Sequence, residues 1–327
     1  MEIKDFDAIP NHYLPASAVT VGNFDGVHVG HREIIRMVLN HAKMLSAPSA
    51  VITFEPHPRE VIFRGQPVPA IIPLAERARL IAELGIDLLG KVNFTHAFAA
   101  QGAEEFISAM AQKLTPKVVV IGHDFRFGKD REGDEDFLRA AGARYGFEVE
   151  VVPAVEVDGK PVSSSRIRGL IQAGEMRRVR KLLGAPFHVV GEVISGHGRG
   201  RDLGFATANL KWEAKLIPPD GVYAAMAYWN DHDCPAVVNI GDNPTFGDSH
   251  VSIEAHLMGF TGDLYQKRLR IALLKRLRGE IKFNSPQALT EQIKLDVTQA
   301  RDELIAEYGD RVARCFGPAG DGQGASR

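Results

Sequence analysis

Two histidines lie three residues apart in the stretch GNFDGVHVGH, residues 22–31. The apolar run 18–22 leads into this stretch, and apolar residues follow at helical spacing over 34–45. His28 and His31 therefore stand between the end of a buried strand and the start of a helix. The N-terminus of a helix offers free N–H groups and partial positive charge, which favour phosphate. Two imidazoles placed there could hold the oxygens of a phosphate whose charge grows in a transition state.

Glycines in the same stretch would let the main chain approach a ligand closely. Gly22, Gly26 and Gly30 are spaced by four residues, which differs from the GxGxxG pattern of dinucleotide-binding loops. The phosphate-binding pattern GxxxxGK[ST] does not occur in the sequence. Two other interpretations stay open. The histidines could only cap the helix or pair locally, or they could bind a metal, for which no third ligand is evident.

The first half of the chain alternates strand and helix patterns, which predicts a doubly wound α/β sheet with helices on both faces. The apolar runs that predict parallel strands are 18–22, 50–54, 86–92, 117–122 and 147–152. The helical patterns cover 34–45, 74–84, 103–114, 134–145 and 163–174. Ligands bind beyond the carboxyl ends of the strands in such sheets. The loop after the first strand is therefore the expected site.

The second half of the chain predicts an antiparallel β-barrel, because short alternating runs separated by turn residues replace the long helical patterns. These runs are 188–195, 222–229, 235–241, 251–258 and 268–274. Ser285 and Pro286 begin a helix that closes the barrel domain and ends at Gly309. The expected extents are 1–184 for the first domain, 185–309 for the barrel domain and 310–327 for a disordered tail, which is poor in apolar residues.

Composition excludes several classes of function. The chain has 327 residues, of which 45% are hydrophobic and 24% charged, as in ordinary globular proteins. The formal net charge is −2, and the basic runs 177–181 and 267–282 contain no aromatic residues, so no nucleic-acid partner is expected. Cys234 and Cys315 provide no disulfide framework or zinc spacing, which favours a reducing compartment. Without a signal-peptide pattern or an apolar run of about 18 residues, we expect a cytoplasmic protein with no membrane contact. A weak homo-oligomer stays open.

Four motifs follow one another in the first half of the chain. They are GNFDGVHVGH at 22–31, FEPHP at 54–58, GHDFRFG at 122–128 and SSSRIR at 163–168. This set resembles the bacterial bifunctional riboflavin kinase/FMN adenylyltransferase family, which carries the H-x-G-H signature of nucleotidyltransferases. The resemblance implies that the phosphate of FMN attacks the α-phosphate of ATP in this domain, and that pyrophosphate leaves. Ser165 stands where the family usually has threonine, and a hydroxyl is kept.

The resemblance also implies roles for individual residues of the first domain. His28, His31 and Arg168 would be the catalytic residues that act on the phosphates. The residues that would bind ATP are Gly22, Asn23, Phe24, Asp25, Gly26, Gly30, Ser164 and Ser165. The residues that would line the flavin side are Asp124, Phe125 and His57. Mg²⁺, or another divalent cation, would be needed for the pyrophosphate.

The second half continues the resemblance in GHGRGRDLGFATANL, residues 196–210, which is similar to the family's riboflavin kinase loop. The residues that this similarity places at ATP are Gly198, Gly200, Arg201 and Gly204, and those that it places at Mg²⁺ are Thr207 and Asn209. Glu254 follows the family-like run NIGDNPTF, residues 239–246. In the family this glutamate accepts the proton of the riboflavin 5′-hydroxyl as its oxygen attacks the γ-phosphate of ATP. The alternating pattern puts Glu254 on the face opposite Ile253 and Ala255.

Three departures from the family pattern lie in the second half. Ala206 replaces a proline, Asn243 replaces an arginine, and Gln266 replaces a glycine. Because the residues proposed for chemistry are all present, we expect a bifunctional enzyme that uses ATP to make FMN from riboflavin and FAD from FMN. The departures at 206 and 243 favour an alternative, an adenylyltransferase whose barrel binds flavin without phosphorylating it. A third interpretation, an H-x-G-H adenylyltransferase with another acceptor, is disfavoured by the barrel.

Overall fold

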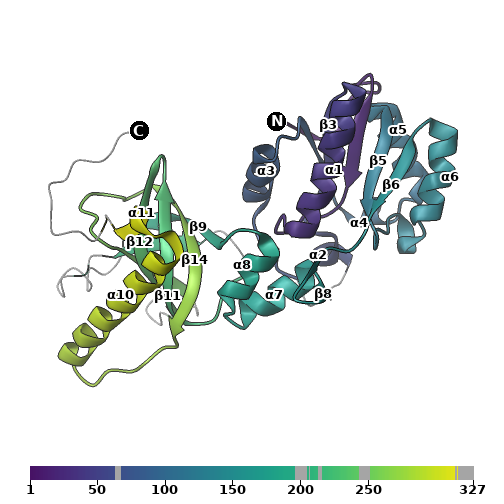
Figure 1. Cartoon of the computed structure of the whole chain (residues 1–327). Coiled ribbons are helices and arrows are strands. Elements are labelled where there is room, and N and C mark those ends of the chain that lie inside the picture. The colour runs from purple at the N-terminus through teal and green to yellow at the C-terminus, as the bar shows by residue number, and fades with distance from the viewer. Residues whose placement is uncertain are drawn as a thin grey trace. The chain divides into compact units, whose positions relative to one another are not determined.

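The structure is a computed structural model that describes residues 1–62, 68–195, 205, 207–212, 216–242, 251–313 and 315 (Figure 1). Contacts within the chain divide it into two compact units, residues 1–166 and 167–327. The division falls inside α7 (Ser164–Gln172), whereas the expected boundary after residue 184 follows the next helix, α8 (Met176–Leu183). The exact extent of each domain stays a prediction, and each unit has the predicted architecture.

Within its described residues, the first unit contains an open sheet of six strands that all pair in parallel. The strands are β1 (Glu2–Asp5), β2 (Ser17–Val21), β3 (Ser49–Glu55), β4 (Leu88–Asn93), β5 (Pro116–Gly122) and β6 (Glu148–Val152). Their order is β1-β4-β3-β2-β5-β6. The predicted parallel sheet is confirmed in β2 to β6. Its sixth strand, β1, escapes prediction because EIKD holds a single apolar residue and forms a strand only by pairing with β4.

Helices cover both faces of this sheet, as predicted. They are α1 (Val29–Leu45), α2 (Pro58–Ile62), α3 (Leu74–Glu83), α4 (His96–Ala99), α5 (Ala103–Leu114) and α6 (Glu135–Tyr145), with short 3₁₀ turns at Phe6–Ala8 and Lys129–Arg131. All five residues of β2 are buried, so both of its faces are covered. Val19 and Val21 belong to the core that α5 and α6 complete, whereas α1 packs on the opposite face with Ile35 and Val38 (Figure 1). A two-stranded hairpin, β7 (Glu156–Val157) with β8 (Lys160–Pro161), precedes α7.

The position of β2 in the sheet determines where a ligand can bind. From β2 the chain adds β3 and then β4 on one side, and later adds β5 and β6 on the other side. The direction in which strands are added therefore reverses beside β2. Crevices at the carboxyl ends of the strands form at such a reversal in open parallel sheets.

The second unit contains a closed antiparallel barrel, which confirms the predicted fold class. Its described strands are β9 (Phe187–Ile194), β10 (Ala208–Trp212), β11 (Gly221–Trp229), β12 (His232–Asp242), β13 (Val251–Leu257) and β14 (Arg268–Arg278), in the closed order β10-β13-β12-β11-β14-β9. Adjacent strands pair antiparallel. β10 is the strand that the sequence analysis does not predict, because it directly follows a glycine-rich stretch whose composition favours a loop.

The predicted closing helix is α10 (Pro286–Tyr308). The Ser285 hydroxyl accepts a hydrogen bond from the amide of Ala288 at 3.2 Å, which caps the helix as its sequence predicts. Ala300 and Leu304 bury the apolar face of α10 against strands of the barrel. A further residue of α10, Asp296, is only 4% exposed despite its charge.

A buried ion pair explains why Asp296 can face the barrel. Arg278 of β14 donates to both of its carboxylate oxygens, with Nε–Oδ1 at 2.9 Å and Nη2–Oδ2 at 2.7 Å. The chain then continues into α11 (Asp310–Ala313), where Val312 is buried in the same cluster as Ala300. The expected disorder from residue 310 is therefore wrong for these four residues, because a single apolar side chain anchors them. Residues 316–327 lie outside the described residues. No helix in the described ranges is long and apolar enough to cross a membrane.

Candidate active sites

The loop between β2 and α1 has an unusual backbone. Phe24 and Val27 have positive φ values of 48° and 43°, which non-glycine residues rarely adopt, and Gly26 has a φ of 86°. The side chains of Phe24 and Val27 are buried, and their burial offsets the backbone strain. A β-carbon at Gly22 would lie 3.2 Å from the ring of Phe24, so glycine leaves room for that ring. The loop thus turns sharply at the carboxyl end of β2.

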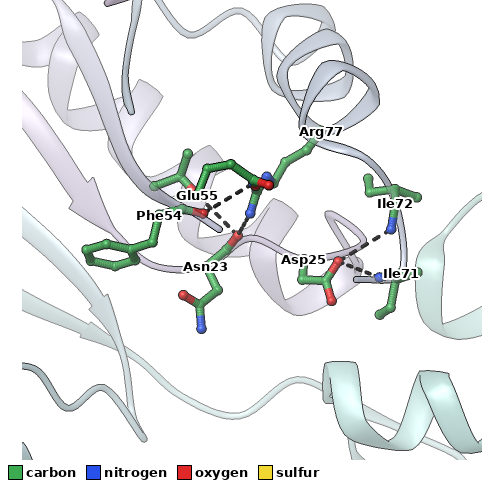
Figure 2. Close-up of polar contacts among 8 residues, drawn as sticks. Asn23, Asp25, Phe54, Glu55, Ile71, Ile72 and Arg77 are labelled. Atoms are coloured by element: carbon green, nitrogen blue, oxygen red, sulfur yellow. Dashed lines mark hydrogen bonds and ion pairs between the residues drawn. The ribbon is translucent and has the colours of Figure 1, made fainter. Parts of the chain in front are cut away.

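Asp25 fixes this loop to a distant segment. Its Oδ1 accepts hydrogen bonds from the amide of Ile71 at 2.8 Å and the amide of Ile72 at 3.4 Å (Figure 2). The residue is only 1% exposed. The main-chain oxygen of Asp25 accepts a bond from the Ser164 hydroxyl at 3.0 Å, which brings the start of α7 to the loop. The structure therefore gives the Asp25 carboxylate a supporting contact that the sequence analysis does not foresee.

His28 and His31 lie side by side at the start of α1. Their rings stack with centroids 3.5 Å apart and an angle of 15° between planes. His28 is also the N-cap, because its Nδ1 accepts a hydrogen bond from the amide of His31 at 3.2 Å. A β-carbon at Gly30 would lie 3.2 Å from Cε1 of His28, so this position favours glycine. His28 thus caps the helix and the two histidines pair locally, as one of the open interpretations states. Nε2 of His28 takes no part in the cap.

Burial keeps both imidazoles neutral. It lowers the pKa of His28 to about 4, although the negative charge of Asp124 acts in the opposite direction. Burial also lowers the pKa of His31 well below its ordinary value, and positive charge on His28 or Arg77 would lower it further. Since Nδ1 of His28 accepts an N–H, the proton of the neutral ring is on Nε2. His28 is therefore a neutral N–H donor at pH 7.

Other predicted residues of the first unit lie at neighbouring strand ends. Asp124 and Phe125 follow β5, where the amide of Phe125 donates to the carbonyl of Gly122 at 3.0 Å in a tight turn. Asp124 is exposed, and its negative charge acts to raise the pKa of His28. His57 follows β3 and is buried, and its Nδ1 accepts from the amide of Arg59 at 3.2 Å. The ends of β2, β3 and β5 thus supply the predicted side chains.

The motif SSSRIR forms the start of α7. Ser165 is exposed and Arg168 is buried. Ser164 and Arg168 are four residues apart, so they lie on one face of the helix. The side chain of Arg166, between them, donates to the carbonyls of Val157 and Lys160 and holds the β7–β8 hairpin. Arg166 therefore has a structural contact that the motif alone does not reveal.

In the barrel, Glu254 lies between two asparagines. It is paired with Asn209 of β10 on one side and with Asn239 of β12 on the other. Directly paired residues of antiparallel strands point to the same face, with β-carbons about 5 Å apart. Ile253 and Ala255 are buried on the opposite face, as predicted. The three polar side chains therefore form a row across β10, β13 and β12.

Asn239 is a residue of this row that the sequence analysis missed. It opens the run NIGDNPTF, and the register of β12 with β13 is what places it beside Glu254. A β-carbon at Gly241 would overlap Oε1 of Glu280 and would lie 3.7 Å from Nδ2 of Asn239. The Glu280 carboxylate therefore reaches over Gly241 toward the end of the row.

Several predicted residues of the barrel fall outside the described residues. They are Gly198, Gly200, Arg201 and Gly204 of the predicted ATP site, and Ala206 and Asn243 among the departures. Thr207 is half-buried and directly precedes β10. No group of three or more His, Cys, Asp or Glu side chains in the described part of the chain could hold a metal ion. A cation at this site would therefore depend on hydroxyl and amide oxygens, together with oxygens of a ligand.

The third departure, Gln266, has a clear structural context. Its φ is 61°, in the left-handed region where glycine is favoured. Its amide nevertheless donates to the carbonyl of Val193 at 2.9 Å. The turn thus forms with glutamine at this position, and the left-handed conformation costs about 1 kcal/mol of local strain.

The buried imidazoles predict how the first unit responds to pH. The pKa of His28 is about 4 in the folded chain against 6.5 ordinarily, so the unfolded chain binds protons more readily in this interval. The free energy of unfolding of the first unit should therefore fall as the pH is lowered from about 6.5 toward 4. Nitrogen-15 NMR of the ring would check the cause. We expect His28 to stay neutral at pH 5.5 when folded and to be mostly protonated at that pH in urea, and a folded-state transition near pH 6.5 would contradict this.

Comparison with known proteins gives the two halves separate matches. A family model described as FAD synthetase matches residues 11–166, and one described as riboflavin kinase matches residues 183–304. The protein of a Streptococcus pneumoniae crystal structure titled "Macrolide-efflux Protein" is 32% identical, with a TM-score of 0.83, and the match covers 92% of this chain and 98% of that one.

Three relatives are each described as bifunctional riboflavin kinase/FMN adenylyltransferase. The Pseudomonas fluorescens protein is 39% identical, over 86% of this chain and 91% of its own length. The proteins of Escherichia coli K12 and Bacillus subtilis are each 36% identical, over 88% and 89% of this chain and 91% and 95% of their own lengths. Since the similarity runs through both units and nearly the whole of these relatives, the chain belongs to the bifunctional riboflavin kinase/FMN adenylyltransferase family.

Proposed function

We propose that the second unit transfers the γ-phosphate of ATP to riboflavin, and that the first unit transfers AMP from ATP to FMN. The products are FMN, then FAD and pyrophosphate. The observation that supports this proposal is the arrangement of polar side chains at one place in the described part of each unit. The stacked histidines stand at the carboxyl end of β2, and Glu254 stands between Asn209 and Asn239.

Adenylyl transfer needs no covalent nucleophile from the chain. The phosphate of FMN attacks the α-phosphorus of ATP, and the bond to pyrophosphate breaks, so the chain must align two polyanions and stabilise the charge between them. His28 donates its Nε2–H to a phosphate oxygen, and His31 holds the ring of His28 in place by stacking. Ser164, Ser165 and Arg168 of α7 bind the triphosphate with two hydroxyls and a guanidinium.

The remaining predicted residues of the first unit shape the site. The glycines at 22, 26 and 30 let the main chain approach the nucleotide, and Asn23 and Phe24 pack around it. Asp25 supports the loop through the amides of Ile71 and Ile72. Asp124, Phe125 and His57, at the ends of β5 and β3, face the flavin nucleotide.

Phosphoryl transfer to riboflavin needs a base beside the attacking hydroxyl. The carboxylate of Glu254 accepts the proton of the 5′-hydroxyl as the oxygen bonds to the γ-phosphorus, and ADP leaves. Asn239 stands beside Glu254 on the adjacent strand. Thr207 and Asn209 would hold Mg²⁺, which supplies charge neutralisation at the ATP phosphates when it is bound. The alignment of Asn209 with Glu254 supports an active kinase over the alternative of a barrel that only binds flavin.

A product assay tests the proposal directly. The purified chain with ATP and Mg²⁺ should convert FMN to FAD, and it should convert riboflavin first to FMN and then to FAD. Chelation of the divalent cation with EDTA should stop both reactions, because each depends on neutralised phosphates. Chromatography separates the three flavins. FAD from FMN without any product from riboflavin would support the kinase-inactive barrel instead.

Replacement of His28 should remove the first activity alone. His28→Ala and His28→Asn should both lower FAD formation from FMN by about 10²–10³-fold, because one transition-state donor is lost. Asparagine is a good N-cap, so its equal effect would separate catalysis from capping. His41→Ala, on the same helix, is the matched control and should keep the rate within about twofold. An equal fall in riboflavin phosphorylation would contradict the assignment of two sites.

Replacement of Glu254 should remove riboflavin phosphorylation and leave FAD formation from FMN intact. Glu254→Gln keeps the shape of the side chain and removes the base, so riboflavin phosphorylation should fall by about 10²–10⁴-fold. FAD formation from supplied FMN should be unchanged. Glu192→Gln, an exposed carboxylate of β9, is the control for charge loss on the barrel. Unchanged phosphorylation in the Glu254 variant would show that another group takes the proton.

A further inference from the structure

Arg77 is a charged residue of α3 that lies inside the first unit and is only 3% exposed. A buried guanidinium is costly unless its donors are bonded. Nη1 donates to the carbonyl of Asn23 at 2.6 Å, and Nη2 donates to the carbonyl of Phe54 at 3.3 Å and to Oε2 of Glu55 at 2.5 Å (Figure 2). The group is thus held by one carboxylate and two main-chain oxygens.

These acceptors belong to two neighbouring strand ends. Asn23 opens the loop after β2, and Phe54 and Glu55 are the last residues of β3. The hydroxyl of Thr53 also donates to the carbonyl of Asn23, at 3.1 Å. A planar guanidinium can donate to three acceptors at fixed angles, which an ammonium group on a flexible stem does less well. Arg77 therefore fixes the carboxyl end of β2 relative to that of β3.

The loop that Arg77 holds ends at the catalytic histidine. It begins at Asn23, includes two buried residues with positive φ, and reaches the N-cap at His28 five residues later. Asp25 bonds to the amides of Ile71 and Ile72, just before α3. The α3 region thus holds the loop at two points, and a strained loop needs such support to keep one conformation.

Arg77 also acts on His31 through its charge. A protonated His31 would stand near this buried cation, and the repulsion lowers the pKa of His31 further. The neutral state of His31, on which the ring of His28 stacks, is therefore favoured by the residue that holds the loop in place.

We propose that Arg77 is a positioning residue for adenylyl transfer, which sets the place of His28 through the carbonyl of Asn23 and the end of β3. The inference rests on the proposed adenylyltransferase function of the first unit. It assigns Arg77 no contact with ATP or FMN. A misplacement of about 1 Å at the reacting groups can lower a rate by 10²-fold, so loss of Arg77 should act on kcat.

The experiment compares Arg77→Lys and Arg77→Met with the same changes at Arg79. Arg79 lies on the same helix but pairs with Glu76 and Glu83, away from the loop. We expect the kcat for FAD formation from FMN to fall by about 10–100-fold in Arg77→Met and by a smaller factor in Arg77→Lys, with the KM for ATP within about threefold. Both Arg79 variants should keep the kcat of the unaltered chain.

Three measurements on the same samples separate positioning from stability. The unaltered chain is assayed first, and failure to make FAD from FMN would count against the proposed function and not against the role of Arg77. ATP-binding stoichiometry counts the folded ATP sites of both units, and riboflavin phosphorylation reports on the second unit alone. A lower stoichiometry with unchanged riboflavin phosphorylation therefore gives the loss of folded first units. A lower kcat at full stoichiometry supports positioning.

Two results would overturn the proposal. The first is a kcat per folded site in Arg77→Met within about threefold of that in Arg79→Met. The second is a loss explained by a smaller folded fraction. If the methionine variant does not fold, the lysine variant decides. Full kcat in it overturns the proposal, a fall of about fivefold or more at full stoichiometry supports it, and failure of both variants to fold would make Arg77 a stability residue only.

Discussion

The parallel pairing of β2 with β3 on one side and with β5 on the other determines where the proposed adenylyltransferase site lies. Because the chain leaves β2 toward opposite halves of the sheet, the end of this strand meets the ends of both neighbours. The histidines follow β2, His57 follows β3, and Asp124 follows β5. The histidine pair, His57 and Asp124 come from three separate segments of the sequence. The register of three buried strands brings them together, and α3 holds two of the strand ends in register through Arg77.

The neutrality of the histidines follows from the same burial. A site for two polyanions gains from hydrogen-bond donors. Two protonated imidazoles beside a buried arginine would nevertheless repel each other and the guanidinium, and this repulsion would destabilise the loop. Stacked neutral rings avoid this, and the N-cap bond to Nδ1 of His28 directs the remaining proton to Nε2. The helix terminus supplies the partial positive charge that the rings lack. In the proposed site, capping and phosphate binding would therefore use the two different nitrogens of the His28 ring.

Sequence periodicity predicts those elements whose own residues carry the pattern. The strands β2 to β6 are apolar enough to be recognised, whereas β1 and β10 exist because a neighbour pairs with them. The same division holds for the sites. Motif spacing predicts His28 and His31, which lie at a strand end. The resemblance to the family implies Glu254, which lies on an alternating strand face. Asn239, Arg77 and Asp296 could not be predicted in this way, because the partner of each lies in a distant segment and is fixed only by tertiary packing.

The two units position their proposed catalytic residues with different kinds of main-chain structure. The first uses a sharp loop with positive φ at buried residues. Its geometry depends on support from outside the loop, from Arg77 and from the amides of Ile71 and Ile72 that Asp25 binds. The barrel uses flat antiparallel register, in which Asn209, Glu254 and Asn239 are aligned by the hydrogen bonds of the sheet itself. A register of this kind tolerates local strain elsewhere. Gln266 takes a glycine-like φ of 61° at the turn before β14 and still bonds to Val193. Its strain lies close to the row that carries Glu254, because Val193 pairs with Leu210, the residue that follows Asn209 in β10.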